Sequence, residues 1–270
     1  MKFLITLGIA ILPVYLIGLY VYKMDDEKES KKLLTKLFIF GMLSCIPAGI
    51  IEINIEPLFG QIDTSNLTKL FIYVALGIAL VEEICKWILV YSIGYKDKEF
   101  NQTYDILVYC VFVSLGFACF ENVLYVLFDN NSILTGMLRA VTAIPGHTSD
   151  AIIMANYLGL AKISQTNNDL KSQNKYLFLS IIMPTLIHAI YDYCLFTENF
   201  LFIAFFAIFL IFIYIYSIRK IKKLSKDNKY LINNELNNTN NEVTINNNYC
   251  PKCGTKVEGQ YCTKCGQKQI

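Results

Sequence analysis

Long apolar stretches alternate with short polar segments along most of this 270-residue chain. A helix of about 20 apolar residues crosses the hydrocarbon core of a bilayer. The pattern predicts seven spans, at residues 3–22, 37–55, 67–93, 104–128, 133–161, 176–196 and 200–218. The fifth span contains Arg139 and the pair Pro145 and Gly146. We therefore expect it to be a short interfacial helix followed by a second helix that starts near His147.

The composition agrees with a membrane protein and excludes an ordinary soluble domain. Hydrophobic residues make up 54% of the chain and charged residues only 17%, and the mean hydropathy is +0.42. The predicted fold is all-α, a polytopic transmembrane helix bundle of about seven spans in contact with the lipid bilayer. We assign residues 1–224 to this domain.

Basic residues follow every second span. Lysines lie in the first, third and fifth connections, and Arg219 with several lysines closes the last span, whereas the segments EPLFGQIDTSN, DNNS and TEN contain neither Lys nor Arg. Because Lys and Arg are retained in the cytoplasm, we predict a multi-pass protein of the cytoplasmic membrane with its N-terminus outside and its C-terminus in the cytosol. The first span lacks a small-residue cleavage site before its basic residues, so we interpret it as a retained helix.

The chain changes character after residue 224. Residues 225–249 contain ten asparagines and almost no apolar periodicity, which predicts a disordered linker. Residues 250–270 carry two C-x-x-C pairs, and four thiolates at this spacing predict a small ribbon around a structural zinc ion. The predicted ligands are Cys250, Cys253, Cys262 and Cys265. We expect a cytosolic protein partner for the ribbon and no nucleic acid, because its lysines are few.

Polar groups lie inside four consecutive apolar stretches, although a charged residue at bilayer depth costs about 2.5–3.5 kcal/mol on insertion scales. Both histidines of the chain are among them. In chain order the groups are Glu82, Glu83 and Lys86, then Glu121 and Asn122, then His147, and finally His188 and Asp192. Such residues mark a functional site by default, so we expect a polar site within the membrane.

Helical spacing brings several of these groups together. Lys86 lies three and four residues after Glu83 and Glu82, so it can reach either carboxylate on its own helix. His188 and Asp192 are four residues apart, a spacing at which the carboxylate can orient the imidazole. At ~1.5 Å of rise per residue, Glu82 and His188 lie roughly 16 and 18 Å from the basic ends of their spans, so we expect them at similar depth.

The order of these motifs resembles the PrsW family of bacterial intramembrane proteases. The matching motifs cover roughly residues 67–196 and read E-E-x-x-K, F-x-x-x-E-N, a single histidine and H-x-x-x-D. The family is distantly similar to the type II CAAX prenyl endopeptidases, from whose motifs this chain departs at Lys86 and Glu121; both departures match the PrsW branch. The resemblance implies cleavage of membrane-anchored protein substrates, with anti-sigma factors as the substrate class of PrsW.

The residues themselves are compatible with peptide hydrolysis, which needs an activated water and stabilisation of an oxyanion. We expect Glu82 or Glu83 to activate the water with His147. The groups expected to orient the substrate or stabilise the oxyanion are His188, Asp192 and Asn122.

The sequence leaves the use of a catalytic metal open. Two histidines and a carboxylate would suffice for a zinc site with one position for water, and the resembling family is often described as metalloprotease. The motif H-E-x-x-H is absent, however, and the related CAAX enzymes have been interpreted as metal-free glutamate proteases. We slightly favour the metal-free interpretation.

Two other classes of protein would use similar residues. A proton- or cation-coupled transporter also places carboxylates and histidines at mid-membrane, but the chain shows no internal repeat. A non-catalytic sensor or scaffold would bind its partner through the ribbon and would tolerate neutral replacement of the buried acids. In that case the Glu–Lys pairs would only neutralise charge for insertion, and the histidines would pack between helices.

Overall fold

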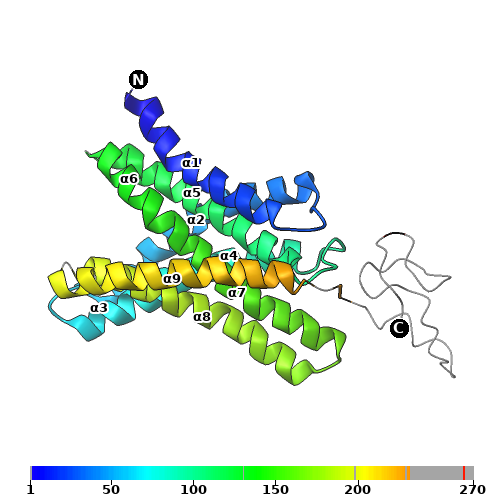
Figure 1. Ribbon diagram of the computed structural model, residues 1–270. Helices are drawn as coiled ribbons and strands as arrows, with labels where there is room; N and C mark the ends of the chain where they lie inside the picture. The colour runs from blue at the N-terminus through cyan, green and yellow to red at the C-terminus, as the bar shows by residue number, and fades with distance from the viewer. Residues whose placement is uncertain (1, 130, 198, 229, 232–263, 265–270) are drawn as a thin grey trace.

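The structure is a computed structural model, and it describes residues 2–129, 131–197, 199–228, 230–231 and 264 (Figure 1). Its helices are α1 Lys2–Lys23, α2 Lys31–Ile55, η1 Glu56–Phe59, α3 Leu67–Tyr73, η2 Val74–Ala79, α4 Leu80–Leu89, η3 Val90–Gly94, α5 Asp105–Phe128, α6 Ser132–Val141, α7 Ala143–Thr166, α8 Leu170–Phe196 and α9 Phe200–Lys226. The short element η1 is a 3-10 turn, and η2 and η3 are π-helical turns. The four cysteines of the predicted zinc ribbon lie outside the described residues.

Helices make up the regular secondary structure of the described residues, apart from one isolated bridge between Gln102 and Tyr230. The prediction of an all-α bundle is therefore confirmed. In Figure 1, α9 runs across α7 and α8, and it packs against both. Helices α1, α2, α6 and α7 surround α5, whose side chains are buried along most of its length.

Two glycines allow α2 and α5 to touch through their backbones. A Cβ atom at Gly41 would lie 2.1 Å from the main-chain oxygen of Val113, and one at Gly116 would lie 2.1 Å from that of Phe38. Small residues permit this kind of approach between membrane helices. The close contact keeps α2 beside the polar groups of α5, on the wall of the cavity described below.

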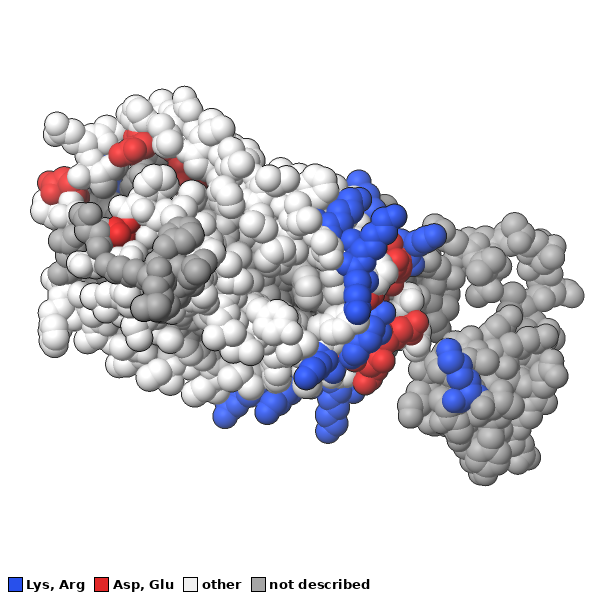
Figure 2. All heavy atoms as spheres, turned by 90° about the horizontal axis from the view of Figure 1, so that it is seen from above, with Lys and Arg blue, Asp and Glu red and all other residues white. Residues whose placement is uncertain are grey.

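The outer surface of the bundle is apolar between its two ends. On α9, for example, Leu201 is 74% exposed, Ile208 69% and Phe212 67%. Apolar surface of this extent is expected where lipid, and not water, surrounds the helices. Figure 2 shows lysine and arginine side chains gathered at one end of the molecule with some acidic side chains among them, further acidic side chains at the other end, and an uncharged belt between the two ends.

Five of the described helices are long and apolar enough to cross a membrane, at Thr6–Lys23, Lys31–Phe59, Asp105–Phe128, Leu170–Phe196 and Phe200–Lys226. The other two predicted spans are also helical, but each is interrupted. Residues 67–94 are divided by the π-helical turns, and the predicted span 133–161 is split into α6 and α7 at Thr142, close to the expected break. The membrane-spanning class is thus confirmed, while the count of seven spans stays a prediction.

The segment that carries α4 is polar inside and apolar outside. Glu82, Glu83 and Lys86 are buried, whereas Leu76 and Ile88 are each 51% exposed. This is the reverse of a helix on a soluble protein, which turns its charged face to water. π-helical turns of the kind found on both sides of α4 are frequent at functional sites. The local pattern therefore directs three charged groups into the bundle.

The chain stays in contact with the bundle beyond the end of α9. The side-chain oxygen of Asn228 accepts a hydrogen bond from the main-chain N–H of Tyr104, at 3.0 Å. The N–H of Leu231 donates to the main-chain oxygen of Asn101, at 2.7 Å. The chain therefore contacts the bundle for a few residues past residue 225, where the linker was predicted to begin.

Candidate active site

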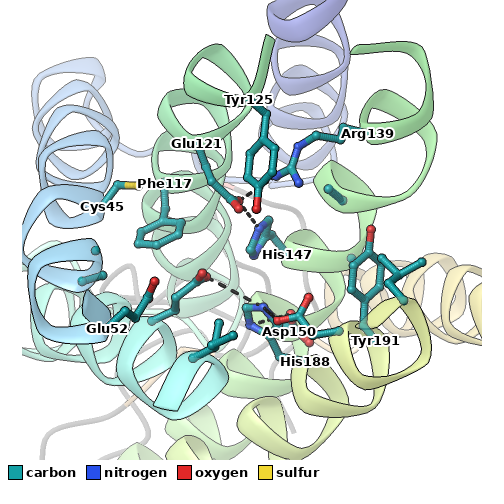
Figure 3. A pocket seen from close by; sticks show the side chains of 18 of the residues that line it. Cys45, Glu52, Phe117, Glu121, Tyr125, Arg139, His147, Asp150, His188 and Tyr191 are labelled. Carbon is teal, nitrogen blue, oxygen red and sulfur yellow. Dashed lines mark hydrogen bonds and ion pairs between the residues drawn. The ribbon is translucent and has the colours of Figure 1, made fainter. Parts of the chain in front are cut away.

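A cavity of about 410 Å³ lies inside the bundle, with walls formed by α2, η2, α4, α5, α6, α7 and α8 (Figure 3). The predicted site residues that line it are Glu82, Glu121, His147, His188 and Asp192. Two more, Glu83 and Lys86, contact the lining side chains from behind. The structure therefore brings groups from α4, α5, α7 and α8 to one place, and Glu82 and His188, which were expected at similar depth, are both among them.

Helix α7 begins beside this cavity, which places His147 in its second turn. Pro145 is tolerated there because the first turn of a helix needs no donor from its N–H. Ser114 of α5 donates a hydrogen bond from Oγ to the main-chain oxygen of His147, at 2.8 Å. The turn that presents the imidazole is thus attached to the central helix.

Lys86 is the cation at the centre of the site. Its Nζ lies 2.7 Å from Oε1 of Glu83, 3.2 Å from Oε2 of Glu82 and 3.1 Å from Nδ1 of His147. An ammonium group has three donors and no acceptor. The three donors of Lys86 therefore have three partners, and its Nζ also lies over the ring of Phe117, 4.3 Å from the ring centroid.

The contact with Lys86 determines which nitrogen of His147 carries the proton. Because the ammonium group can only donate, Nδ1 of His147 must accept, and the proton of the neutral ring is on Nε2. Nε2 lies 2.8 Å from Oε2 of Glu121 and donates to it. The ring of His147 also stands nearly perpendicular to that of His188, with centroids 5.1 Å apart.

Glu121 is in turn paired with a cation from α6. Its Oε2 lies 2.9 Å from Nη2 of Arg139, and Nε of Arg139 donates to Oδ1 of Asn122 at 2.7 Å. The guanidinium group stacks on Tyr125, 3.8 Å from the ring centroid. Asn122 is fully buried and does not line the cavity. It therefore lies where it orients Arg139, and its expected role toward substrate or oxyanion stays a prediction.

Carboxylates surround His188 on both of its nitrogens. Nδ1 lies 3.0 Å from Oε1 of Glu83 and 3.8 Å from Oδ2 of Asp150. Nε2 lies 3.4 Å from Oδ2 of Asp192 and 3.8 Å from Oε2 of Glu82. The pairing with Asp192 that the spacing predicted is present, but the shorter contact is to Glu83 on another helix.

Three further residues belong to this site although the sequence analysis did not place them in it. Arg139 was interpreted as a sign of an interfacial helix, and its pairing with Glu121 depends on how α6 packs on α5. Asp150 follows His147 by one helical turn, a spacing that could have indicated it. Glu52 of α2 also lines the cavity, and an acid inside an apolar stretch was the available signal.

Four of these side chains have the donor atoms for a metal ion. One atom each from Glu82, Glu83, His147 and His188 lies within 4.8 Å of the others. Two imidazole nitrogens with carboxylate oxygens suit zinc and similar transition-metal ions. Lys86 donates to only one oxygen of each glutamate, and Oε2 of Glu83 is buried without a hydrogen-bond partner among the described residues, so the carboxylates can offer further oxygens to an ion. His147 could bind an ion only by giving up its contact with Lys86 or with Glu121.

Comparison with known proteins places this chain in a family. Residues 29–218 match the family model described as PrsW family intramembrane metalloprotease. Protease PrsW of Oceanobacillus iheyensis is 36% identical over 192 residues, which are 71% of this chain and 82% of that protein. Protease PrsW of Geobacillus kaustophilus is 34% identical over 197 residues, covering 73% of this chain and 81% of that protein, and Protease PrsW of Bacillus subtilis is 30% identical over 194 residues, covering 71% and 82%.

No solved structure matches the chain. The sequence match nevertheless covers all of the helices that build the cavity, from Cys45 on α2 to Phe196 on α8. The resemblance seen in the motifs is therefore confirmed over most of the chain. This protein belongs to the PrsW family of intramembrane metalloproteases and is a peptidase of the membrane.

Proposed function

We propose that Glu82 is the carboxylate that activates water for peptide hydrolysis. Glu82 lines the cavity and is 6% exposed, whereas its neighbour Glu83 is 0% exposed and does not line it. A general base must be within reach of a water that also reaches the peptide carbonyl, so access to the cavity separates the two carboxylates. This difference in access is the observation that carries the proposal.

The proposed role of Glu83 is to hold its neighbouring side chains in position. Its Oε1 accepts from Lys86 at 2.7 Å and lies 3.0 Å from Nδ1 of His188. Both contacts are buried, and Oε2 of Glu83 has no hydrogen-bond partner among the described residues. Glu83 therefore fixes a lysine from its own helix and a histidine from α8 relative to each other.

His188 is the proposed proton donor to the leaving amine. The water oxygen bonds to the peptide carbonyl carbon while its proton passes to Glu82, and the C–N bond breaks as the amine nitrogen takes a proton from His188. Nε2 of His188 lies 3.8 Å from Oε2 of Glu82, so the proton held by Glu82 can return to the histidine over a short path. His147, held by Lys86 and Glu121, lines the cavity next to His188.

A metal ion fits the same set of donors. Glu82, Glu83, His147 and His188 are the residues that would hold it. Bound there, such an ion would supply a Lewis acid for the developing oxyanion and a water that ionises more easily.

The proposed substrates are proteins anchored in the membrane by a single helix, with anti-sigma factors among the first to be tried. The cavity lies among helices whose outer surfaces face lipid, so a substrate helix can approach it from within the bilayer. At ~1.5 Å per residue, His188 lies roughly 12 Å from the Phe196 end of α8 and roughly 27 Å from its Leu170 end, which favours cleavage in the half of the membrane away from the lysines.

The test is cleavage of tagged single-span proteins by the purified full-length chain in liposomes. We expect Glu82→Gln to lower kcat/KM by about 10²–10⁴-fold, the usual contribution of a general base. Glu83→Gln also lowers the rate, because Lys86 and His188 lose their common partner. Glu56→Gln, a matched change at an exposed acid in η1, should leave the rate unchanged.

The pH dependence of kcat/KM separates the two glutamates. Residual activity of Glu83→Gln should keep the acidic limb of the profile, and residual activity of Glu82→Gln should lose it, because the limb reports ionisation of the base. Wild-type activity in Glu82→Gln, or loss of the acidic limb only in Glu83→Gln, would contradict the assignment.

We also propose that the protein lies in the cytoplasmic membrane with its N-terminus outside and its C-terminus in the cytosol. The connections that carry lysines lie between α1 and α2, after η3, and between α7 and α8. A membrane-impermeant maleimide applied to intact cells should label Ser65→Cys but not Asn167→Cys. Labelling of Asn167→Cys alone would reverse the orientation.

A further inference from the structure

A second group of buried acids lies at the basic end of the bundle, away from the active site. Asp25 and Glu29 come from the connection between α1 and α2, and Asp105 is the first residue of α5. Glu121, on the same helix as Asp105, lies roughly 24 Å further along it at ~1.5 Å per residue. The three carboxylates, called here the Asp25 cluster, therefore take no part in the proposed hydrolysis.

The oxygen atoms of the cluster converge on one point. One carboxylate oxygen from each of Asp25, Glu29 and Asp105 lies within 4.8 Å of the other two. The residues are 3%, 7% and 1% exposed. Three carboxylates this close together and this well buried repel one another unless something between them supplies positive charge or protons.

Several of these oxygens are left without a partner. Both carboxylate oxygens of Asp25 and Oδ1 of Asp105 are buried and have no hydrogen-bond partner among the described residues. Buried polar groups in native proteins are normally satisfied, so an orphaned buried carboxylate indicates an unseen ion or water. Asp25 is the stronger indication, because neither of its oxygens is satisfied.

Two of the remaining oxygens of the cluster are held in place by neutral donors. Oδ2 of Asp105 accepts from the main-chain N–H groups of Asn101 and Gln102, at 2.9 and 2.7 Å. Oε2 of Glu29 accepts from the hydroxyl of Tyr109, at 2.7 Å. These bonds orient the carboxylates without adding positive charge.

The basic side chain placed at the cluster by the described contacts is Lys28. Its ammonium group donates to the main-chain oxygens of Asp25 and Lys23 and not to a carboxylate, and it lies 5.4 Å from the ring centroid of Tyr22. One lysine set against three carboxylates leaves two negative charges uncompensated, which is the charge of a divalent cation.

We propose that the Asp25 cluster binds one hard divalent cation, of the class of Mg²⁺, Ca²⁺ and Mn²⁺. All of its donors are oxygen atoms, the ligands that these ions prefer, and it offers no nitrogen or sulfur for zinc. The ion joins the connection between α1 and α2 to the start of α5. It does so independently of the hydrolytic site.

The ion would also stabilise the place where the C-terminal tail leaves the bundle. Oε2 of Glu27, in the same connection, accepts from Nε2 of Gln102 at 2.8 Å and from the hydroxyl of Tyr230 at 2.6 Å. Gln102 in turn donates to Asp105. Occupation of the cluster would therefore order the contacts that hold the first residues after α9.

The proposal is tested by Mn²⁺ titration of the full-length protein in an uncharged detergent after chelation, with bound Mn²⁺ followed by electron paramagnetic resonance. Wild type should bind one more Mn²⁺ per chain than Asp25→Asn, and Ca²⁺ should displace that ion. Glu29→Gln should weaken the same site by at least about tenfold, as loss of metal-site residues usually does. Asp26→Asn removes an exposed charge from the neighbouring position and should bind as wild type does.

A thermal measurement covers the case in which a variant folds poorly. With chelator, Asp25→Asn should unfold at a higher Tm than wild type, because repulsion is relieved. With Mn²⁺, wild type and Asp26→Asn should gain more Tm than Asp25→Asn does. Equal Mn²⁺ binding by wild type and Asp25→Asn would overturn the proposal. A wild-type Tm that does not respond to Mn²⁺ would also overturn it, since shared protons would then balance the cluster.

Discussion

Replacement of Lys86 by methionine tests whether the ammonium group holds the active site together. Lys86 is 1% exposed and donates to Glu82, Glu83 and His147 at 3.2, 2.7 and 3.1 Å. Methionine keeps most of the side-chain volume but leaves two buried carboxylates without their cation. Removing one partner of a buried ion pair costs about 3–5 kcal/mol. We therefore expect Lys86→Met to lower the free energy of unfolding by this amount and to abolish cleavage.

The assay is thermal unfolding in detergent at one fixed scan rate, because unfolding of membrane proteins is often irreversible. At about 2–4 °C per kcal/mol for a chain of this size, the expected fall in apparent Tm is roughly 6–20 °C. Lys171→Met, the same change at an exposed lysine on α8, should stay within about 0.5 kcal/mol of wild type.

A double variant tests whether the lost stability comes from the unpaired carboxylates. Glu83→Gln in the Lys86→Met background removes one of the uncompensated charges, so the double variant should be more stable than Lys86→Met alone, with a coupling energy of about 0.5–3 kcal/mol. A Lys86→Met protein as stable as the Lys171→Met control would refute the central role of the ammonium group. So would a double variant no more stable than the single one.

Three further predictions concern Arg139, the contact between α2 and α5, and the predicted zinc ribbon. Arg139→Gln should reduce kcat/KM by about 10–100-fold, as loss of a residue that orients a site does. Arg139→Lys should be impaired as well, because one ammonium group cannot replace the contacts of the guanidinium group with both Glu121 and Asn122. Wild-type rates in Arg139→Gln would exclude this role. Gly41→Ala should lower the free energy of unfolding by about 1–3 kcal/mol, measured by thermal unfolding, because the new Cβ would meet the main-chain oxygen of Val113. The control Gly49→Ala, on the same helix, meets nothing within 4 Å and should leave the protein equally stable or more stable. Combined Cys250→Ser and Cys253→Ser should remove about one zinc per chain in elemental analysis while cleavage continues; an unchanged zinc content would argue against the ribbon, and loss of cleavage would make the tail part of the catalytic unit.

Much of this site could be predicted from single helices. Glu82, Glu83 and Lys86 stand three and four residues apart, and His188 and Asp192 four apart, so the period of the α-helix already places each set on one face. Depth in the membrane follows from rise per residue, which is why groups on separate helices were expected at one level. These inferences need no knowledge of how the helices pack.

Contacts between helices could not be predicted in the same way. The pairing of Arg139 with Glu121, the burial of Asn122 behind the cavity and the contact of Glu83 with His188 each depend on how far one helix is rotated and shifted against another. Hydropathy does not contain that information, because it reports how apolar a segment is and not which partner its polar residues face.

Hydropathy along the chain was enough to identify an all-α membrane protein, and the motifs indicated the protease family and most of the residues of the site. The tertiary structure alone separated Glu82 from Glu83 by their access to the cavity, and it alone assembled the Asp25 cluster from a connection and a helix start far apart in sequence. The two kinds of property depend on residues at different separations along the chain. Insertion into a bilayer is decided by the summed hydrophobicity of about 20 neighbouring residues, whereas the environment of a single carboxylate is decided by whichever side chains packing brings within a few ångströms of it.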